Sequence, residues 1–293
     1  MAATSIDQGI TARREEPERA LQPWEIYACP SCKRELQPGR EELHCAVCTA
    51  TYPVRGGIPD FILEKLDQSG NFSLRLIGRR DSSILLDFAA YIYESCIYPP
   101  VCNIYGGWRS TSLKKLAREV SAIVGSTNGV ILDVACGPGT YGRRIASTSR
   151  TVYGVDACMS FLRRGAHYVE RDRIPNVHFA RATVEALPFR AGLFDAAICA
   201  GSLNHFSDTF LALREINRTM KAGAPLVVMC FFVGTRGLIR RRSLRDRAEK
   251  QGGHIFELSQ LDRYLAEAGF EAFHPRAHGS ILVFSARKKP AQH

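Results

Sequence analysis

The stretch Gly129-Val-Ile-Leu-Asp-Val-Ala-Cys-Gly-Pro-Gly-Thr-Tyr-Gly142 decides the fold of this chain. Its first six residues form a short apolar run that is typical of a buried strand. The glycines at positions 137, 139 and 142 predict a tight turn, and a helix is expected to follow through Ile145. A strand, a glycine-rich turn and a helix in this order are typical of a nucleotide-binding α/β unit.

The pattern of alternating strands and helices continues to both sides of this turn. A helix is predicted over 113–124, and further strands over 151–155, 177–180, 194–200 and 226–232. The end of the chain is different, because a helix over 257–268 is followed by two closely spaced strands, 270–274 and 280–286. Two strands this close in sequence predict a hairpin, and therefore one antiparallel strand in the sheet. The sequence therefore predicts an α/β fold over 113–293, a doubly wound Rossmann-like sheet with a C-terminal antiparallel hairpin.

The glycine turn also fits the dinucleotide-binding pattern, with Asp156 at the expected distance downstream, so an NAD enzyme is a competing interpretation. Asp133 weighs against it, because a carboxylate at the strand end would repel a pyrophosphate but suits an ammonium group. The tract Leu187-Pro188-Phe189 and the terminal hairpin also weigh against it.

Together these segments resemble class I S-adenosylmethionine-dependent methyltransferases, of the type 11-like group that includes quinone and other small-molecule enzymes. The resemblance runs from about Val130 to Arg287 and is carried by VILDVACGPGTY, VYGVDACMSFL, EALPF, LFDAAICAGSLNHF and LAEAGF. It implies S-adenosylmethionine as the cofactor and an in-line methyl transfer, in which alignment and a dry pocket supply most of the catalysis.

The resemblance also implies which residues bind the cofactor. Asp133 and its loop would hold the methionine end, and Asp156 would bind the ribose hydroxyls. The position that usually carries an adenine-binding aspartate is Thr183 here, which leaves the backbone of Val184 as a donor and keeps a non-catalytic cofactor fold as an alternative. The implied set is Asp133, Ala135, Cys136, Gly137, Gly139, Asp156, Ala157, Met159, Thr183, Val184 and Ala200.

Four of the ten cysteines stand in two CxxC pairs separated by twelve residues: Cys29, Cys32, Cys45 and Cys48. Two such turns with a hairpin between them present four thiolates to one point, the geometry of a structural zinc site. The other six are expected to be buried core thiols: Cys96, Cys102, Cys136, Cys158, Cys199 and Cys230.

The segments CPSCKREL, LHCAVC and YPVRGGIP resemble Trm112-like zinc ribbons over residues 25–63. This resemblance implies a small metal-stabilised domain that supports a methyltransferase. We expect residues 1–24 to form a flexible tail. Residues 64–112 form an aromatic-rich helical connector, which either packs between the domains or forms a substrate-facing wall or lid.

A general base is needed only if the methyl acceptor must lose a proton. His205, just beyond the fourth strand, is the first candidate, with Tyr141 and His254 behind it. Each of the three is also interpreted as an ordinary structural residue. The tract Ala200-Gly-Ser-Leu203 is not the Asn/Asp-Pro-Pro-Tyr/Phe tract of many amine methyltransferases, so methylation of that kind is not expected.

The net charge is +10, and part of it lies in one segment: Arg236, Arg240, Arg241, Arg242, Arg245, Arg247 and Lys250. A charge run is usually a solvated helix face, but RNA phosphate contact or a cap over an anionic substrate also fits. We expect a small-molecule acceptor, with RNA methylation as the second hypothesis and a non-catalytic scaffold as the third. No apolar run approaches bilayer length and the N-terminus does not resemble a secretory signal, so a cytoplasmic protein without a membrane partner is expected.

Overall fold

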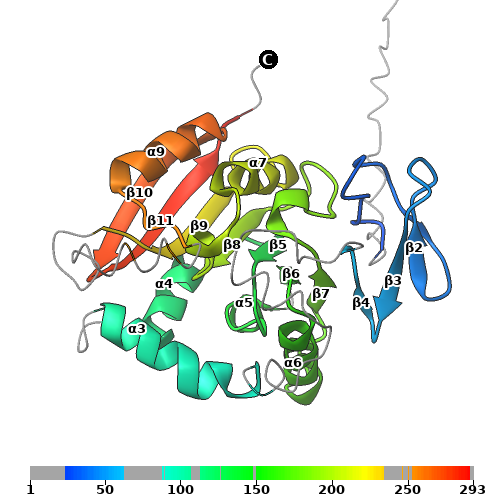
Figure 1. Cartoon of the computed structure of the whole chain (residues 1–293), viewed down its shortest axis with the longest axis horizontal. Helices are drawn as coiled ribbons and strands as arrows, with labels where there is room; N and C mark the ends of the chain where they lie inside the picture. Colours follow the sequence, from blue (N-terminus) through cyan, green and yellow to red (C-terminus); the bar gives the residue numbers. More distant parts are fainter. Residues whose placement is uncertain are drawn as a thin grey trace, which may run out of the picture.

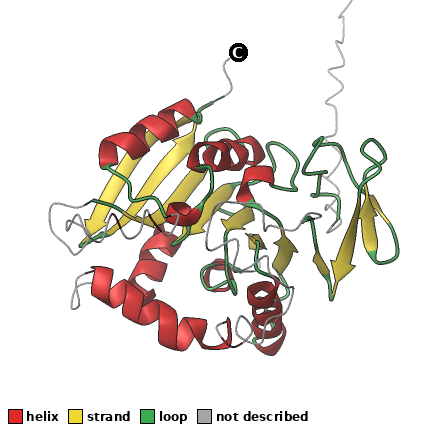
Figure 2. Ribbon diagram, in the orientation of Figure 1, coloured by secondary structure: helices red, strands yellow, loops and turns green. Residues whose placement is uncertain are grey.

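The computed structural model describes residues 24–62, 88, 90–106, 113–125, 127–147, 150–233, 246, 250 and 253–290. These residues form a seven-stranded sheet with helices on both faces and a separate four-stranded sheet beside it (Figures 1 and 2). The larger sheet is the predicted Rossmann-like domain, and the smaller sheet belongs to the cysteine-rich segment. The fold class predicted from the sequence is confirmed.

The larger sheet has the strand order β10-β11-β9-β8-β5-β6-β7. Its five parallel strands are β5 (Gly129–Val134), β6 (Arg150–Asp156), β7 (Val177–Arg181), β8 (Ala196–Ala200) and β9 (Pro225–Phe231). β11 (Ile281–Lys288) runs antiparallel to both β9 and β10 (Phe270–His278). The strand order reverses between β5 and β8, and a ligand site is expected at the carboxyl ends of strands at such a reversal.

Helices cover both faces of this sheet, because successive strand residues point to opposite sides. Ile131 packs in the core beneath α4 (Leu113–Val124), α5 (Gly142–Ile145) and α6 (Met159–Arg171). Leu132 packs in the core beneath α7 (Thr209–Thr219) and α9 (Leu258–Glu267).

The ribbon, residues 24–62, is a small antiparallel sheet beside the β7 edge (Figure 1). Its strands are β1 (Gln37–Pro38), β2 (Glu42–His44), β3 (Thr51–Arg55) and β4 (Ile58–Pro59). Tyr27, Tyr52 and Phe61 of the ribbon belong to the same buried cluster as Leu132 of β5. Tyr27 also stacks on Phe189, with ring centroids 5.5 Å apart. The ribbon therefore shares one apolar core with the α7 face of the larger sheet.

The described part of the connector forms a π-helical turn, η2 (Tyr93–Ile97), that continues into α3 (Tyr98–Gly106). One expectation is wrong here, because Cys96 is exposed rather than buried. The helix turns Tyr98 and Cys102 inward, which leaves Cys96 on the outer side. Trp108 and nearly all of the predicted tail lie outside the described residues. Among the described residues, no helix is both long enough and apolar enough to span a membrane.

Candidate active site

The glycine turn after β5 opens onto the carboxyl edge of the sheet. Three of its residues have left-handed backbone: Ala135 with φ 50°, Gly137 with φ 55° and Gly139 with φ 73°. A Cβ atom on Gly137 would meet open space, whereas one on Gly139 would lie 3.0 Å from the ring of Phe179. Gly137 thus leaves room for a ligand, and Gly139 lets the turn pack against β7.

A cavity of about 390 Å³ lies at this edge, within the size range of small-ligand sites. Eight of the eleven residues that the sequence assigned to the cofactor line it: Ala135, Cys136, Gly137, Asp156, Ala157, Thr183, Val184 and Ala200. The other three, Asp133, Gly139 and Met159, lie behind the lining. The structure thus brings together residues at the ends of β6 and β8 and residues from the segments that follow β5, β6 and β7.

Asp156 is the acidic group at the end of β6. Its Oδ2 accepts a hydrogen bond from the Gly137 N–H at 2.9 Å, and its Oδ1 accepts one from the Cys158 N–H at 2.8 Å. Burial raises the pKa of Asp156, while these backbone hydrogen bonds and the charge of Arg181 oppose the rise. The carboxylate is therefore held rigidly, and each oxygen keeps a lone pair for a ligand hydroxyl.

Asp133 is buried beneath the turn instead of facing the cavity. Its Oδ2 accepts a hydrogen bond from the Gly142 N–H at 2.9 Å. Burial, together with the charge of Asp156, raises the pKa of Asp133 to about 7. The sequence suggested that this carboxylate could contact a ligand ammonium directly. The geometry does not favour that contact, because Asp133 lies outside the cavity lining and its carboxylate binds the Gly142 N–H. Met159 likewise packs in the core at the start of α6.

The connector forms one wall of the cavity, and the sequence analysis did not identify which of its residues would do so. Tyr93 and Tyr98 both line the cavity, and their rings stack with centroids 5.2 Å apart. The hydroxyl groups of Tyr98 and Tyr141 are 3.2 Å apart. Glu94 accepts hydrogen bonds from Thr140 and Arg143 of the glycine turn and α5. The connector therefore lines the cavity, whereas a substrate-facing role for this wall stays a prediction; the richness of the connector in aromatic residues was the available signal.

A smaller chamber of about 140 Å³ adjoins the main cavity, since Tyr93, Tyr98 and His205 line both. The rest of its wall is almost entirely apolar: Val101, Cys102, Gly201, Met229, Cys230, Phe231 and Ile281. Such a lining suits an apolar ligand group and offers it few hydrogen bonds.

The three candidate bases are placed differently. His205, at the end of η4 (Leu203–His205), borders both cavities although its side chain is exposed, and partial desolvation by its neighbours together with the charge of His254 lowers its pKa. Tyr141 lines the main cavity, but burial raises its pKa and its hydroxyl donates to the Met229 Sδ at 3.7 Å. The side chain of His254 is exposed and lies outside both linings.

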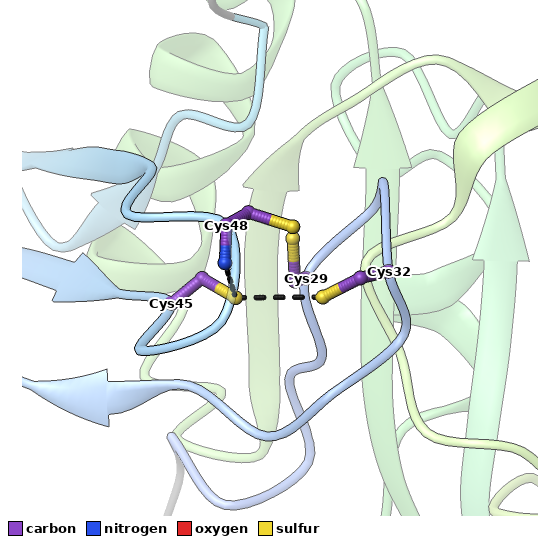
Figure 3. Close-up of side chains that lie close together, drawn as sticks. All are labelled: Cys29, Cys32, Cys45 and Cys48. Carbon is purple, nitrogen blue, oxygen red and sulfur yellow. Dashed lines mark hydrogen bonds between the residues drawn. The ribbon is translucent and has the colours of Figure 1, made fainter.

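The ribbon holds the four predicted ligand cysteines around one point (Figure 3). Their Sγ atoms all lie within 4.8 Å of one another, and those of Cys32 and Cys45 are 3.5 Å apart. A tetrahedral zinc ion with bonds of about 2.3 Å would need sulfur atoms about 3.8 Å apart, so the cluster fits this metal. None of the four is in a disulfide.

The two CxxC turns repeat one backbone conformation. The Cys29 N–H donates to the Arg34 carbonyl at 2.8 Å, and the Cys45 N–H donates to the Ala50 carbonyl at 2.9 Å. The residue after each second cysteine has left-handed backbone, with φ 61° at Lys33 and φ 56° at Thr49. Burial of Cys29 is outweighed by hydrogen bonds from Tyr52 and from backbone N–H groups, which lower the pKa of this thiol to about 6.

The basic segment that includes Arg240 lies outside the described residues, apart from Asp246 and the exposed Lys250. Its two functional interpretations therefore stay predictions.

Comparison with known proteins shows which proteins the domain is similar to. Residues 131–223 match the family model described as a methyltransferase domain. An uncharacterized chloroplastic methyltransferase of Arabidopsis thaliana is 22% identical, over 94% of this chain and 82% of the relative. The 2-phytyl-1,4-naphtoquinone methyltransferase of Trichormus variabilis is 30% identical, over 45% of this chain and 60% of that enzyme.

Among solved structures, phosphoethanolamine N-methyltransferase 2 of Haemonchus contortus with S-adenosyl-L-methionine is similar with a TM-score of 0.58. It is 18% identical, and the match covers 73% of this chain and 59% of that one. The predicted methyltransferase fold is confirmed, and the match to a methyltransferase domain over residues 131–223 agrees with the resemblance seen in the sequence.

Proposed function

We propose that this chain, a class I S-adenosylmethionine-dependent methyltransferase, transfers the methyl group to a small, largely apolar acceptor. The observation that carries the proposal is the pair of adjoining cavities at the carboxyl edge of the sheet. The larger one suits a polar cofactor, and the smaller one offers an apolar site directly beside it. Residues that border both would align donor and acceptor for an in-line displacement.

The residues present fit the cofactor. When bound, S-adenosylmethionine supplies a methyl group made reactive by the positive sulfur. Asp156 would accept hydrogen bonds from the ribose hydroxyls, and Gly137 leaves space for close approach of the ligand. Thr183 and Val184 would face the adenine. Asp133 would support the cofactor indirectly, because it fixes the glycine turn by accepting a hydrogen bond from the Gly142 N–H.

The chain's own residues would do the rest of the chemistry. Tyr93 and Tyr98 cover one side of the cavity and exclude water from the reacting atoms. His205, whose lowered pKa favours the neutral imidazole at pH 7, would take the proton of an acceptor that must lose one. The likeness to a naphthoquinone methyltransferase supports a ring-shaped acceptor of this kind.

The proposal includes a structural zinc ion in the ribbon. Four thiols at the right spacing leave no position open for a substrate, which is the pattern of a structural site rather than a catalytic one. A cytoplasmic location also stays part of the proposal, although the Arabidopsis relative is described as chloroplastic.

RNA methylation is the second candidate, favoured by the net charge of +10. It predicts RNA binding that weakens steeply with salt and that is reduced by changing Arg240, Arg241 and Arg242 to Gln. The apolar lining of the smaller cavity favours a small-molecule acceptor over RNA.

The test begins with calorimetric titration of the wild type with S-adenosylmethionine, and with NAD as a negative control. Transfer of labelled methyl to 1,4-naphthoquinols, to total RNA and to a buffer blank is then compared. We expect transfer to the quinol-type probe, and a fall of about a hundredfold or more in His205→Gln. His167→Gln is the matched control, because that histidine of α6 is exposed and lies outside both cavities. The proposal fails if no cofactor binds, and RNA replaces the small molecule if only RNA is labelled.

A further inference from the structure

The ribbon touches the wall of the cofactor cavity on both sides of one short segment. Residues 182–185 line the cavity directly after β7. Just before them, the Phe61 N–H of the ribbon donates to the Arg181 carbonyl at 2.8 Å. Just after them, the Ala28 N–H donates to the Pro188 carbonyl at 2.9 Å, and Arg190 donates back to the Ile26 carbonyl at 3.1 Å. The segment is therefore fixed to the ribbon at both of its ends.

One buried side chain extends this connection to the acidic end of the site. Arg181 is 6% exposed, and its Nη1 lies 3.1 Å from Oδ2 of the ribbon residue Asp60, which is 2% exposed. The Arg181 Nε donates to the Ala157 carbonyl at 3.0 Å. Ala157 lines the cavity and follows Asp156 in the chain. A continuous path of contacts thus runs from the ribbon through Arg181 to the backbone beside Asp156.

Asp60 is itself held in a fixed position. The Ile62 N–H donates to its Oδ1 at 3.2 Å, and the Arg55 guanidinium approaches its Oδ2 at 3.6 Å. Both ends of the ion pair are removed from water, so neither can swap its partner for solvent without moving the backbone that carries it.

We infer that the ribbon is a positioning element of the cofactor site, acting through Asp60 and Arg181 on the Asp156–Ala157 backbone and on the 182–185 wall. The inference rests on the proposed binding of S-adenosylmethionine in the larger cavity. It gives the ribbon a role in cofactor affinity and not only in stability. Neither residue touches the reacting atoms, so both are positioning residues.

The test uses the full chain with its metal and compares Asp60→Asn with Glu35→Gln. Glu35 pairs with Arg190 at 3.2 Å, so it also joins the ribbon to the domain, but both side chains are exposed and lie outside the cavity lining. We expect Asp60→Asn to weaken binding of S-adenosylmethionine about tenfold in calorimetry, with bound zinc unchanged. Glu35→Gln should bind within about twofold of the wild type.

Three further measurements separate positioning from general destabilisation. In the Asp60→Asn enzyme, KM for the cofactor should rise while KM for the acceptor stays the same. Asp60→Glu, which restores the charge, should recover part of the affinity. Arg181→Lys, which cannot bond Asp60 and the Ala157 carbonyl at once, should weaken binding even if Asp60→Asn does not fold.

The outcomes are distinct. If the wild type binds no S-adenosylmethionine, the proposed function fails and the positioning role falls with it. If the wild type binds it, and Asp60→Asn or Arg181→Lys binds equally well, only the positioning role is overturned.

Discussion

The ribbon and the seven-stranded sheet are neighbours that are stabilised in different ways. In the sheet, fully buried aliphatic residues such as Ile131, Leu132 and Ile198 fill both faces, and the periodic apolar pattern specifies the structure. In the ribbon, the centre is a group of four thiols, and apolar residues such as Tyr27 are buried largely against the neighbouring domain. About 40 residues cannot bury enough apolar surface to fold on their own. The stability of the sheet therefore depends on an apolar pattern that many residues share. The stability of the ribbon depends on the chemical identity of a few residues, above all the four cysteines.

The largest effect on either region is expected from replacing one of the four clustered cysteines of the ribbon. We expect Cys29→Ser to release zinc and to unfold the ribbon, because structural zinc contributes about 10–16 kcal/mol of folding free energy in small metal-binding peptides. Hydrogen exchange should show lost protection over 24–62, with protection retained in β5, β8 and β9. Cys199→Ser, at a buried core position in β8, is the control. It should keep the metal and lose about 1–3 kcal/mol of stability. Equal zinc content in both variants would contradict the proposal.

The second expected effect concerns the glycine turn. Gly137→Arg should abolish measurable binding of S-adenosylmethionine, because the side chain would occupy the space left for the ligand, while the sheet stays folded. Gly192→Arg is a matched control, since Gly192 also has a left-handed backbone, φ 64°, and open space around its Cβ position, but lies outside the cavity lining. Both variants should lose about 1–2 kcal/mol from backbone strain. Retained cofactor affinity in Gly137→Arg, measured by calorimetry, would rule out the proposed orientation of this turn.

A smaller effect, on the pH dependence of stability, is expected at the buried aspartates, which differ between the two regions. Asp60 in the ribbon has a cationic partner, whereas Asp133 in the sheet is bonded to a backbone N–H. Burial raises the pKa of Asp133 from 3.8 to about 7. Between these values the folded protein holds a proton that the unfolded chain has lost, so the stability that Asp133 contributes is complete below about pH 4 and is lost as the pH rises through 7.

Asp133→Asn keeps an oxygen acceptor for the Gly142 N–H and removes the titration. Urea unfolding at pH 5, 6, 7 and 8 should show a flatter dependence of stability on pH in the variant than in the wild type. Parallel curves for the two proteins would show that Asp133 does not carry this linkage.

The smallest effect is expected at the two less buried ion pairs between the two regions, Lys33–Glu215 and Arg190–Glu35. The Lys33 Nζ lies 2.7 Å from Glu215 Oε2, and the Glu215 side chain is 11% exposed. Lys33→Met should cost about 1 kcal/mol in urea unfolding. Arg190→Gln, which breaks the exposed pair with Glu35, should change the free energy of unfolding by less than about 0.5 kcal/mol. The reverse order would show that the partly buried pair is the weaker contact.

Local patterns made the strands, the helices and the clustering of the four CxxC cysteines predictable from the sequence. β5, the glycine turn and Asp156 lie within 28 residues, so spacing alone relates them. The inward placement of Asp133 was not foreseen, because the sequence does not show that Gly142 returns within 2.9 Å of its carboxylate.

Long-range contacts were beyond sequence reasoning. Asp60 and Arg181 are 121 positions apart, and nothing in either neighbourhood indicates their pairing. Tyr93 and Tyr98 belong to the connector, whose aromatic content is visible in the sequence. Which of its residues face the cavity depends on how α3 packs against α4 and β11, and the sequence does not show this packing. The exposure of Cys96 has the same origin.

The contact between Asp60 and Arg181 has a consequence for the order of events during synthesis. Each CxxC turn spans only a few residues, so the proposed zinc ion could be captured as soon as Cys48 has left the ribosome. The surface that the ribbon covers is made much later, since its contacts at Arg181 and Glu215 are separated from it by 121 and 182 positions. Domains that emerge first fold first, while distant pairings must wait for their partners. A nascent chain would therefore carry a ribbon whose apolar side, around Tyr27 and Phe61, stays uncovered until most of the sheet has been translated. During that interval the uncovered apolar surface makes the chain most prone to aggregation.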